Sequence, residues 1–203
     1  MRLSSLFLAA IALMALALAC GGGSKEDVAA GTCTAPAQAP EVIVKSYPQK
    51  PPLTIDKDKK YTATVKTIRG NFTIELLPKV APEHVNSFVF LARDGYYNGV
   101  IFHRIEPEFV VQGGDPSGTG RGGPGYTIPL EAGTEKFLRG VLGMARSNDP
   151  NSAGSQWFVV LSDTKARHLE GTYTAFGKVT EGMDVVDCLA IGDAMIAVDI
   201  AES

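Results

Sequence analysis

Apolar and polar residues alternate in short runs along most of the chain. Residues 61–68 alternate and are rich in Thr, Val and Ile, residues 69–71 read as a turn, and residues 72–76 return. Alternation puts every second side chain on one face of a sheet, so this stretch predicts a β-hairpin. Further strands are expected at 102–105, 109–112, 126–129, 137–145, 155–161, 173–179 and 194–200. The pattern therefore predicts a mainly β protein.

Two stretches follow helical spacing instead. The first begins near Pro82, which is tolerated early in a helix, and ends at Gly95. Its apolar stripe consists of Val85, Phe88, Val89 and Ala92. A second helix is expected near 183–189. The residues expected to face the sheet from that helix are Met183, Val186 and Ala190.

The N-terminus reads as a targeting segment, with a signal peptide at 1–19. Arg2 precedes an apolar stretch at 6–18, which is shorter than the roughly 20 residues of a membrane-spanning helix. Ala19 and Cys20 are followed by Gly21-Gly22-Gly23-Ser24, which resembles a bacterial lipoprotein cleavage site. We therefore expect a lipid on Cys20 and an extracytoplasmic location, in the periplasm or on the cell surface. Ala17 stands where Leu is usual, so ordinary cleavage and an uncleaved anchor remain alternatives.

The composition divides the rest of the chain into two parts. Residues 20–58 are rich in Gly, Ala and Pro and predict a flexible linker, whereas residues 59–203 predict one globular domain. The chain has 203 residues, 45% of them hydrophobic, which suits one domain with appendages. Its net charge of −3 and mixed signs argue against nucleic acid as a partner.

Besides Cys20, the chain has two cysteines, Cys33 and Cys188. Outside the cytoplasm they could form a disulfide, and two free thiols are the equal alternative. Their spacing does not match any common metal site, so no metal is expected.

The most informative run spans 102–115 and contains Arg104 among large apolar residues. An unpaired buried charge is very costly, so this cation needs partners. One interpretation is a structural ion pair. The other is a ligand site in which Arg104 and Gln112 direct donors at a group that docks on Phe109. The run alone leaves both open.

Two further motifs carry little weight. The Gly-rich loop 118–125 contains GxGxxG, but a dinucleotide fingerprint needs a helix directly afterwards, and Pro124 stands there instead. Ser155 follows Gly154, but the GxSxG motif of serine hydrolases is absent. These observations argue against nucleotide binding and serine hydrolysis.

The order of the sequence blocks is more specific than any single block. FHRI, EPEFVVQGGD, a Gly-rich loop, GMAR with GSQWFVV, and HLEGTYTAFGKV follow one another between residues 61 and 200. In this order they resemble the cyclophilin family of peptidyl-prolyl isomerases. The resemblance implies a closed eight-stranded antiparallel β-barrel capped by two α-helices. It also implies catalysed rotation of X–Pro bonds in proline-containing polypeptides, without a cofactor. Nothing in the sequence demands an oligomer, so a monomer is the default.

The resemblance also assigns roles to individual residues. Rotation needs a donor that faces the proline nitrogen and a dry pocket for the ring, because the amide loses its conjugation in the twisted state. Arg104 is implied as the donor and Gln112 as its orienting partner, which also binds the substrate backbone. The pocket is implied to consist of Phe109, Val110, Phe158 and Leu169. The implied neighbours are His103 at the edge, the backbone of Arg146 after Ala145, and the aromatic wall of Tyr173.

Three positions depart from the family pattern. His168 stands where cyclosporin-sensitive members carry Trp, so we expect weak cyclosporin binding. Tyr173 replaces a common His, and Arg146 replaces Asn. The alternative function is a non-catalytic module that binds proline peptides as a chaperone or scaffold, and Arg104 is the residue that separates the two.

Overall fold

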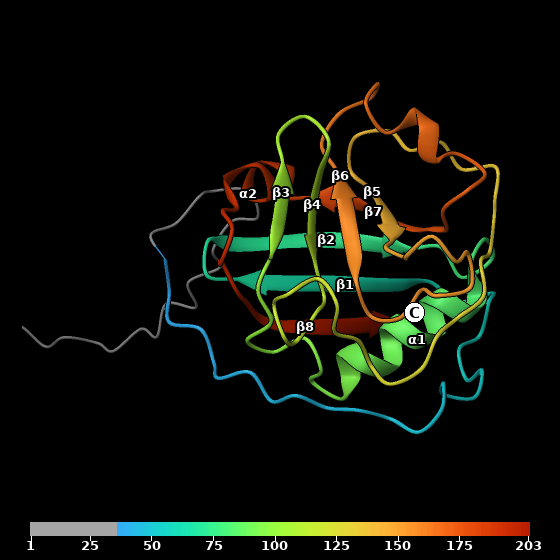
Figure 1. Cartoon of the computed structure of the whole chain (residues 1–203), viewed down its shortest axis with the longest axis horizontal. Helices are drawn as coiled ribbons and strands as arrows, with labels where there is room; N and C mark the ends of the chain where they lie inside the picture. The colour runs from blue at the N-terminus through green and yellow to red at the C-terminus, as the bar shows by residue number, and fades with distance from the viewer. Residues whose placement is uncertain (1–35) are drawn as a thin grey trace, which may run out of the picture.

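The computed structural model describes residues 36–203, of which residues 61–202 carry one eight-stranded antiparallel sheet (Figure 1). Its strand order is β3-β4-β6-β5-β7-β2-β1-β8. The strands are β1 Tyr61–Thr67, β2 Gly70–Leu76, β3 Arg104–Glu106, β4 Val110–Gly113, β5 Val141–Met144, β6 Trp157–Val160, β7 Ala175–Glu181 and β8 Met195–Glu202. The mainly β prediction is confirmed.

The sheet is an open half-barrel, so the expected closed barrel is wrong for this chain. β3 and β8 are the two edges, and no ladder joins them. The segment before β3 meets the beginning of β8 through an isolated bridge between Ile101 and Ala194 and through backbone hydrogen bonds such as that from Phe102 N to Asp193 O at 2.8 Å. The physical reason is the length of β3, which ends after three residues at the turn containing Pro107 and offers too little backbone for a second ladder.

Some predicted strands are shorter than expected. The stretch 126–129 forms only a bridge between Ile128 and Ala153, because Pro129 has no N–H to donate. The strand expected at 137–145 is limited to β5, and the one expected at 102–105 begins at Arg104.

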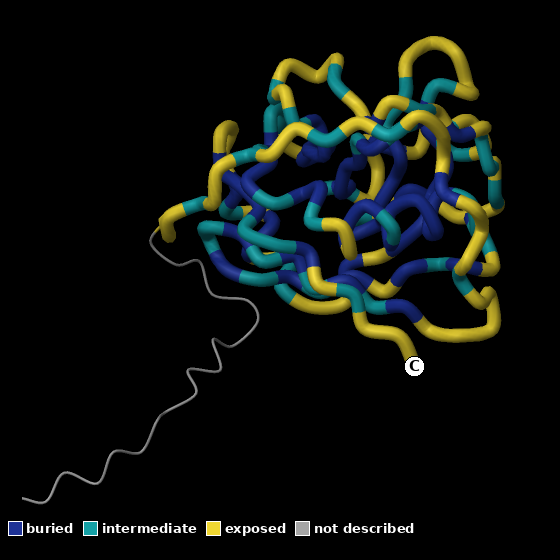
Figure 2. The backbone as a smooth tube through the Cα atoms, turned by 90° about the horizontal axis from the view of Figure 1, so that it is seen from below, coloured by how far each residue is buried: buried dark blue, intermediate teal, exposed yellow. Residues whose placement is uncertain are grey.

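The first helix, α1 Pro82–Arg93, covers one end of the half-barrel (Figure 1). Its predicted apolar stripe is buried, as expected. The ring of Phe88 lies 6.0 Å from that of Trp157 and 5.4 Å from that of Phe176. These contacts lie in the core, and Figure 2 shows the buried backbone gathered in the middle of the domain. α1 thus holds together strands from both halves of the sheet.

A distant carboxylate caps the beginning of α1. Glu131 accepts hydrogen bonds from the backbone N–H groups of Glu83 and His84 at 3.1 and 3.0 Å, and its Oε2 lies 2.7 Å from Nδ1 of the buried His84 ring. The first N–H groups of a helix have no partner within the helix, and a carboxylate satisfies them. The connection before β5 is therefore fastened to α1.

The second helix, α2 Met183–Cys188, is shorter than predicted, and a short 3₁₀ helix, η1 Arg167–Leu169, was not predicted. Ala190 was expected to face the sheet, but it is exposed because the backbone becomes extended at Leu189. Val186 is buried as expected, and Met183 is partly buried against the core. Val185 and Leu189 are buried as well. Within residues 36–203, no helix has the length and apolar character that a membrane crossing requires.

The N-terminal strap, which we define as residues 36–58, has no helix or strand and runs along the domain beside α1 (Figure 1, blue to cyan). Asn86 of α1 accepts a hydrogen bond from Thr54 N at 2.9 Å and donates one to Pro52 O at 2.9 Å. Lys50 forms an ion pair with Glu83. We expected this segment to be part of a flexible linker, but these contacts hold it against the domain.

The predicted signal peptide at 1–19 and the predicted lipid site at Cys20 lie outside the described residues. Cys188 is disulfide-bonded. The other two cysteines, Cys20 and Cys33, also lie outside the described residues.

Candidate active site

A pocket of about 290 Å³ opens where β3, β4 and β6 meet η1 and the chain after β5. We call it the apolar pocket after the Phe, Val, Ala and Leu side chains in its lining. Nine of the ten residues predicted for substrate contact or catalysis line it. They are Arg104, Phe109, Val110, Gln112, Ala145, Arg146, Phe158, Leu169 and Tyr173. His168 lines it as well. The structure therefore brings together residues from four separate blocks of the sequence.

Phe158 belongs to the wall of this pocket and is tightly fixed. It pairs with Gln112 on β4 and with Gly143 on β5 in the sheet register. Its ring stacks on Phe137 at 6.0 Å and meets Tyr173 edge-on at 6.1 Å. A Cβ on Gly143 would lie only 2.2 Å from Cζ of Phe158, so the glycine makes room for the ring. The apolar pocket depends on this missing side chain.

Arg104 lies at the rim, opposite Gln112 in the register of β3 and β4. Its Nη1 donates to Oε1 of Gln112 at 2.8 Å, and its Nε donates to Oε1 of Glu106 at 3.0 Å. Nη2 reaches the same Glu106 oxygen at 2.5 Å, and the guanidinium carbon lies 5.8 Å from the centre of the Phe109 ring. Arg104 is thus both a member of an ion pair and part of a pocket rim.

Glu106 was missed in the sequence, although a signal was available. Residues i and i+2 of a strand share a face, so Glu106 was placed to meet Arg104. The side chains of Arg104 and Glu106 are 42% and 51% exposed. Glu106 and Gln112 together accept from three of the five guanidinium N–H groups, so two N–H groups remain for another acceptor. The cation is therefore oriented while it retains donors.

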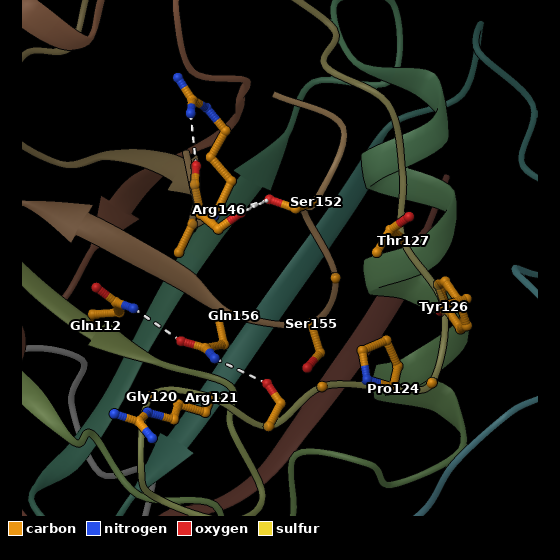
Figure 3. Close-up of a pocket in the computed structure, with 16 residues that line it drawn as sticks. Gln112, Gly120, Arg121, Pro124, Tyr126, Thr127, Arg146, Ser152, Ser155 and Gln156 are labelled. Carbon is orange, nitrogen blue, oxygen red and sulfur yellow. Dashed lines mark hydrogen bonds between the residues drawn. The ribbon is translucent and has the colours of Figure 1, made fainter. Parts of the chain in front are cut away.

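Gln112 links this rim to the Gly-rich loop. Its Nε2 donates to Oε1 of Gln156 at 3.0 Å, and Nε2 of Gln156 donates to the carbonyl oxygen of Gly122 at 2.9 Å (Figure 3). Gln156 was also missed, because the GSQWFVV block that contains it was used for Phe158 and gave Gln156 no role. Two neutral amides connect the arginine with the loop.

A second cavity, here called the side pocket, adjoins the apolar pocket and has a volume of about 680 Å³ (Figure 3). The loop segment 120–127 forms one of its walls, and Ser152 and Ser155 contribute to another. Both cavities share the residues Gln112, Ala145 and Arg146. A chain bound in one cavity can therefore continue into the other.

Asp115 shapes the loop that borders the side pocket. Its buried carboxylate accepts hydrogen bonds from the backbone N–H groups of Ser117 at 2.7 Å, Gly120 at 2.6 Å and Gly122 at 3.1 Å. Burial alone would raise the pKa of Asp115, but these donors and the Ser117 hydroxyl hold it below its usual value. A charged Asp115 therefore organises the start of the Gly-rich loop.

His103 does not line the apolar pocket, although the resemblance implied a place at its edge. The imidazole faces the Gly-rich loop, where a Cβ on Gly120 would lie 3.6 Å from its Cδ2. Both ring nitrogens are buried and have no hydrogen-bond partner among the described residues. Burial lowers the pKa of His103 because it disfavours the charged ring.

Arg146 uses its charge away from the side pocket. Its guanidinium carbon lies 4.3 Å from the centre of the Tyr173 ring, and its Nη2 donates to Thr172 O at 3.0 Å. Figure 3 shows the side chain rising away from the cavity, whereas its backbone borders it. The ring of His168 stacks on Phe109 at 5.5 Å. The residues that depart from the family pattern thus fasten the outer rim of the apolar pocket.

Together these features form an apolar socket of ring size with a cationic donor at its rim. A socket of this kind can hold a compact apolar ring while a guanidinium N–H group donates to an atom of that ring. The neighbouring side pocket can accept the chain on one flank of the ring.

The comparisons with known proteins agree with this geometry. Residues 62–200 match the family model described as cyclophilin type peptidyl-prolyl cis-trans isomerase/CLD. A peptidyl-prolyl cis-trans isomerase of Helicobacter pylori is 44% identical over 70% of this chain and 87% of its own length. One of Synechococcus elongatus is 41% identical over 68% of this chain and 94% of its own length.

A solved structure gives the same result. The cyclophilin type peptidyl-prolyl cis-trans isomerase of Cryptosporidium parvum is 29% identical, with a TM-score of 0.65. The match covers 71% of this chain and 99% of that one. A second crystal structure, obtained in the presence of the dipeptide Ala-Pro, matches with a TM-score of 0.64. The chain therefore belongs to the cyclophilin-type peptidyl-prolyl cis-trans isomerases, the enzymes that accelerate rotation about X–Pro peptide bonds.

Proposed function

We propose that this chain isomerises X–Pro bonds in extracytoplasmic polypeptides and that Arg104 is the group that lowers the rotation barrier. The observation that supports this proposal is the position of Arg104, which Gln112 and Glu106 orient at the rim of an apolar pocket walled by Phe158. An oriented donor beside a ring-sized apolar socket is what this reaction requires.

The reaction needs neither a nucleophile nor a metal. Amide conjugation gives X–Pro rotation a barrier of about 18–20 kcal/mol. In the twisted state the proline nitrogen becomes pyramidal and gains a localised lone pair, to which an N–H group of Arg104 donates. Only the part of this hydrogen bond that exceeds ground-state binding accelerates the reaction. The preset orientation of the guanidinium by Gln112 reduces the cost of reorganisation.

The other residues of the pocket hold the substrate. Phe109, Val110, Phe158 and Leu169 enclose the proline ring and exclude water. The backbone of Arg146 pairs with the residue before proline, as a strand pairs with an extended peptide. The ring is then fixed while the preceding carbonyl rotates.

The second candidate function is a non-catalytic module that binds proline-containing segments. It is favoured by the ion pair of Arg104 with Glu106, which could keep the guanidinium in a purely structural role. In that case the pocket would bind proline peptides without accelerating rotation.

For the location, we propose a lipid anchor at Cys20 that holds the domain on a bacterial membrane outside the cytoplasm. The apolar stretch at 6–18 and the disulfide at Cys188 support this proposal, because stable disulfides are typical of oxidising compartments. Labelled fatty acid should be incorporated into the wild-type chain and not into Cys20→Ala. Equal labelling of both would contradict the anchor.

The activity is tested with a proline-isomerisation assay on a short X–Pro peptide. We expect Arg104→Ala to lower kcat/KM by about 100-fold, the loss typical for removal of one transition-state donor. Arg93→Ala is the matched control and should leave the rate unchanged, because Arg93 pairs with Glu202 of β8 and lines neither cavity. Equal rates for the wild type and Arg104→Ala would contradict the role of Arg104. Peptide binding without acceleration by the wild type would favour the binding module.

A further inference from the structure

The N-terminal strap contacts the wall of the side pocket from behind. The backbone N–H of Tyr47 donates to the carbonyl oxygen of Pro124 at 2.8 Å. A Cβ on Gly125 would lie 2.6 Å from Tyr47 O and 2.5 Å from Ser46 Oγ, so the two backbones are in close contact. Pro124, Gly125 and Tyr126 all line the side pocket. The strap therefore supports this wall directly.

Tyr47 is itself fastened to α1 and its C-terminal end. Its ring meets Phe90 edge-on at 5.1 Å and Tyr126 at 6.3 Å. Its hydroxyl donates to Oδ2 of Asp94 at 2.6 Å, and Lys45 Nζ reaches the same oxygen at 3.0 Å. The hydrogen bond from Tyr47, and to a smaller extent that from Lys45, lowers the pKa of Asp94. Tyr47 thus connects the strap, the helix and the pocket wall.

The wall needs such support because of its composition. The loop segment 120–125 has four glycines, and glycine gives a backbone more conformational freedom than any other residue. A Cβ on Gly123 would meet no atom within 4 Å, so the middle of the loop is open on that side. The Tyr126 hydroxyl and Ser87 Oγ of α1 lie 2.8 Å apart. Together, α1 and the strap restrict the end of the loop.

We propose that Tyr47 is a positioning residue that sets the side pocket for the substrate residues flanking the X–Pro bond. This inference rests on the proposed function and deepens it. The two cavities share Gln112, Ala145 and Arg146, and an extended chain advances about 3.3 Å per residue. A peptide with its proline in the apolar pocket therefore places a flanking residue over the side pocket. The enzyme would select extended substrates through a segment that precedes the family-matched residues 62–200.

The test compares a blocked Ala-Pro substrate, which fills only the apolar pocket, with a nine-residue peptide that carries four residues on each side of proline. Tyr47→Ala should lower kcat/KM for the long peptide about five-fold and leave the short one unchanged. Tyr47→Phe keeps the ring contacts and should restore most of the long-peptide activity. Lys50→Ala is the matched control in the strap, because its ion pair with Glu83 lies outside the side pocket.

If Tyr47→Ala lowers kcat/KM equally for both peptides, or for neither of them, the inference is overturned. If Tyr47→Ala fails to fold in a thermal melt, Asp94→Ala is the second variant. It removes the hydrogen bonds of Tyr47 and Lys45 to Asp94 and should show the same selective loss of kcat/KM to a smaller degree. If the wild type accelerates neither peptide, the proposed function fails, and the inference is then decided by calorimetry. Weaker binding of the long peptide alone to Tyr47→Ala supports it, and equal binding of both peptides overturns it.

Discussion

The carboxylate of Glu131 offers a quantitative test of how the fold is stabilised. Glu131→Gln keeps the size of the side chain but replaces one acceptor oxygen by an NH₂ group. Three donors converge on the wild-type carboxylate, two from the first turn of α1 and one from the His84 ring. At least one of them must lose its acceptor in the variant. The helix would then begin with an unpaired N–H group or a displaced connection.

The expected cost follows from the contacts. Loss of a helix cap costs about 1 kcal/mol, and hydrogen bonds to charged groups contribute about 1.5–3 kcal/mol. The Glu131 side chain is 19% exposed, so solvent replaces little of what is lost. We expect the free energy of unfolding to fall by about 2 kcal/mol for Glu131→Gln. For a domain of this size that corresponds to a Tm lower by about 4–8 °C.

The free energy of unfolding lost in Glu131→Gln should depend on pH. Burial alone would raise the pKa of Glu131, but hydrogen bonds from the His84 ring and from the backbone of Glu83 and His84 lower it. A carboxyl group with a lowered folded pKa contributes its full stability above the unfolded value of about 4.3. That contribution is lost as the pH falls through the folded pKa. The difference between wild type and variant should therefore be fully present at pH 7 and shrink below about pH 4.

Urea unfolding followed by circular dichroism at several pH values measures this difference. Glu135→Gln is the matched control, because the same change is made on the same connection at an exposed side chain. It should alter the free energy of unfolding by less than about 0.5 kcal/mol. A Glu131→Gln variant as stable as Glu135→Gln at pH 7, or a difference that grows in acid, would refute the capping argument.

Two further predictions concern the apolar pocket. Gly143→Ala would place a Cβ 2.2 Å from Phe158 and 2.7 Å from Phe137, so the Phe158 ring must move. We expect kcat/KM for a short X–Pro peptide to fall at least about ten-fold, which corresponds to about 1.4 kcal/mol in activation free energy. An unchanged rate would show that the ring position is unimportant. His168→Trp restores the indole of cyclosporin-sensitive members beside Phe109, and calorimetry should find at least about ten-fold tighter cyclosporin binding. Nanomolar binding by the wild type would contradict the role given to His168.

The pattern of apolar and polar residues was enough to predict the elements in which burial repeats regularly along the sequence. The hairpin of β1 and β2 and the apolar stripe of α1 were found because burial of one face repeats every two or every three to four residues. The residues of the apolar pocket were found because their order matches a family. Neither signal depends on contacts between distant parts of the chain.

The features that were missed all depend on such contacts. Glu131 caps a helix that begins 49 positions earlier in the sequence, at Pro82, and no periodicity marks that pair. The strap reads as a linker because Pro-rich composition does not reveal which backbone groups find partners on a folded surface. The open sheet follows from the shortness of β3, which an apolar run cannot specify. Ala190 was misplaced because helix ends are the least periodic part of a helix.

The hydrogen bonds from Arg104 to the Gly-rich loop all run in one direction. Arg104 donates to Gln112, Gln112 to Gln156, and Gln156 to the carbonyl of Gly122. Inverting the amide of Gln112 would bring its NH₂ group against the guanidinium, and inverting that of Gln156 would bring NH₂ against NH₂. This row of hydrogen bonds therefore has only one self-consistent direction, and each amide dipole strengthens the next hydrogen bond. The cation sets the orientation of a glycine carbonyl two side chains away, although no other charged group takes part in the connection.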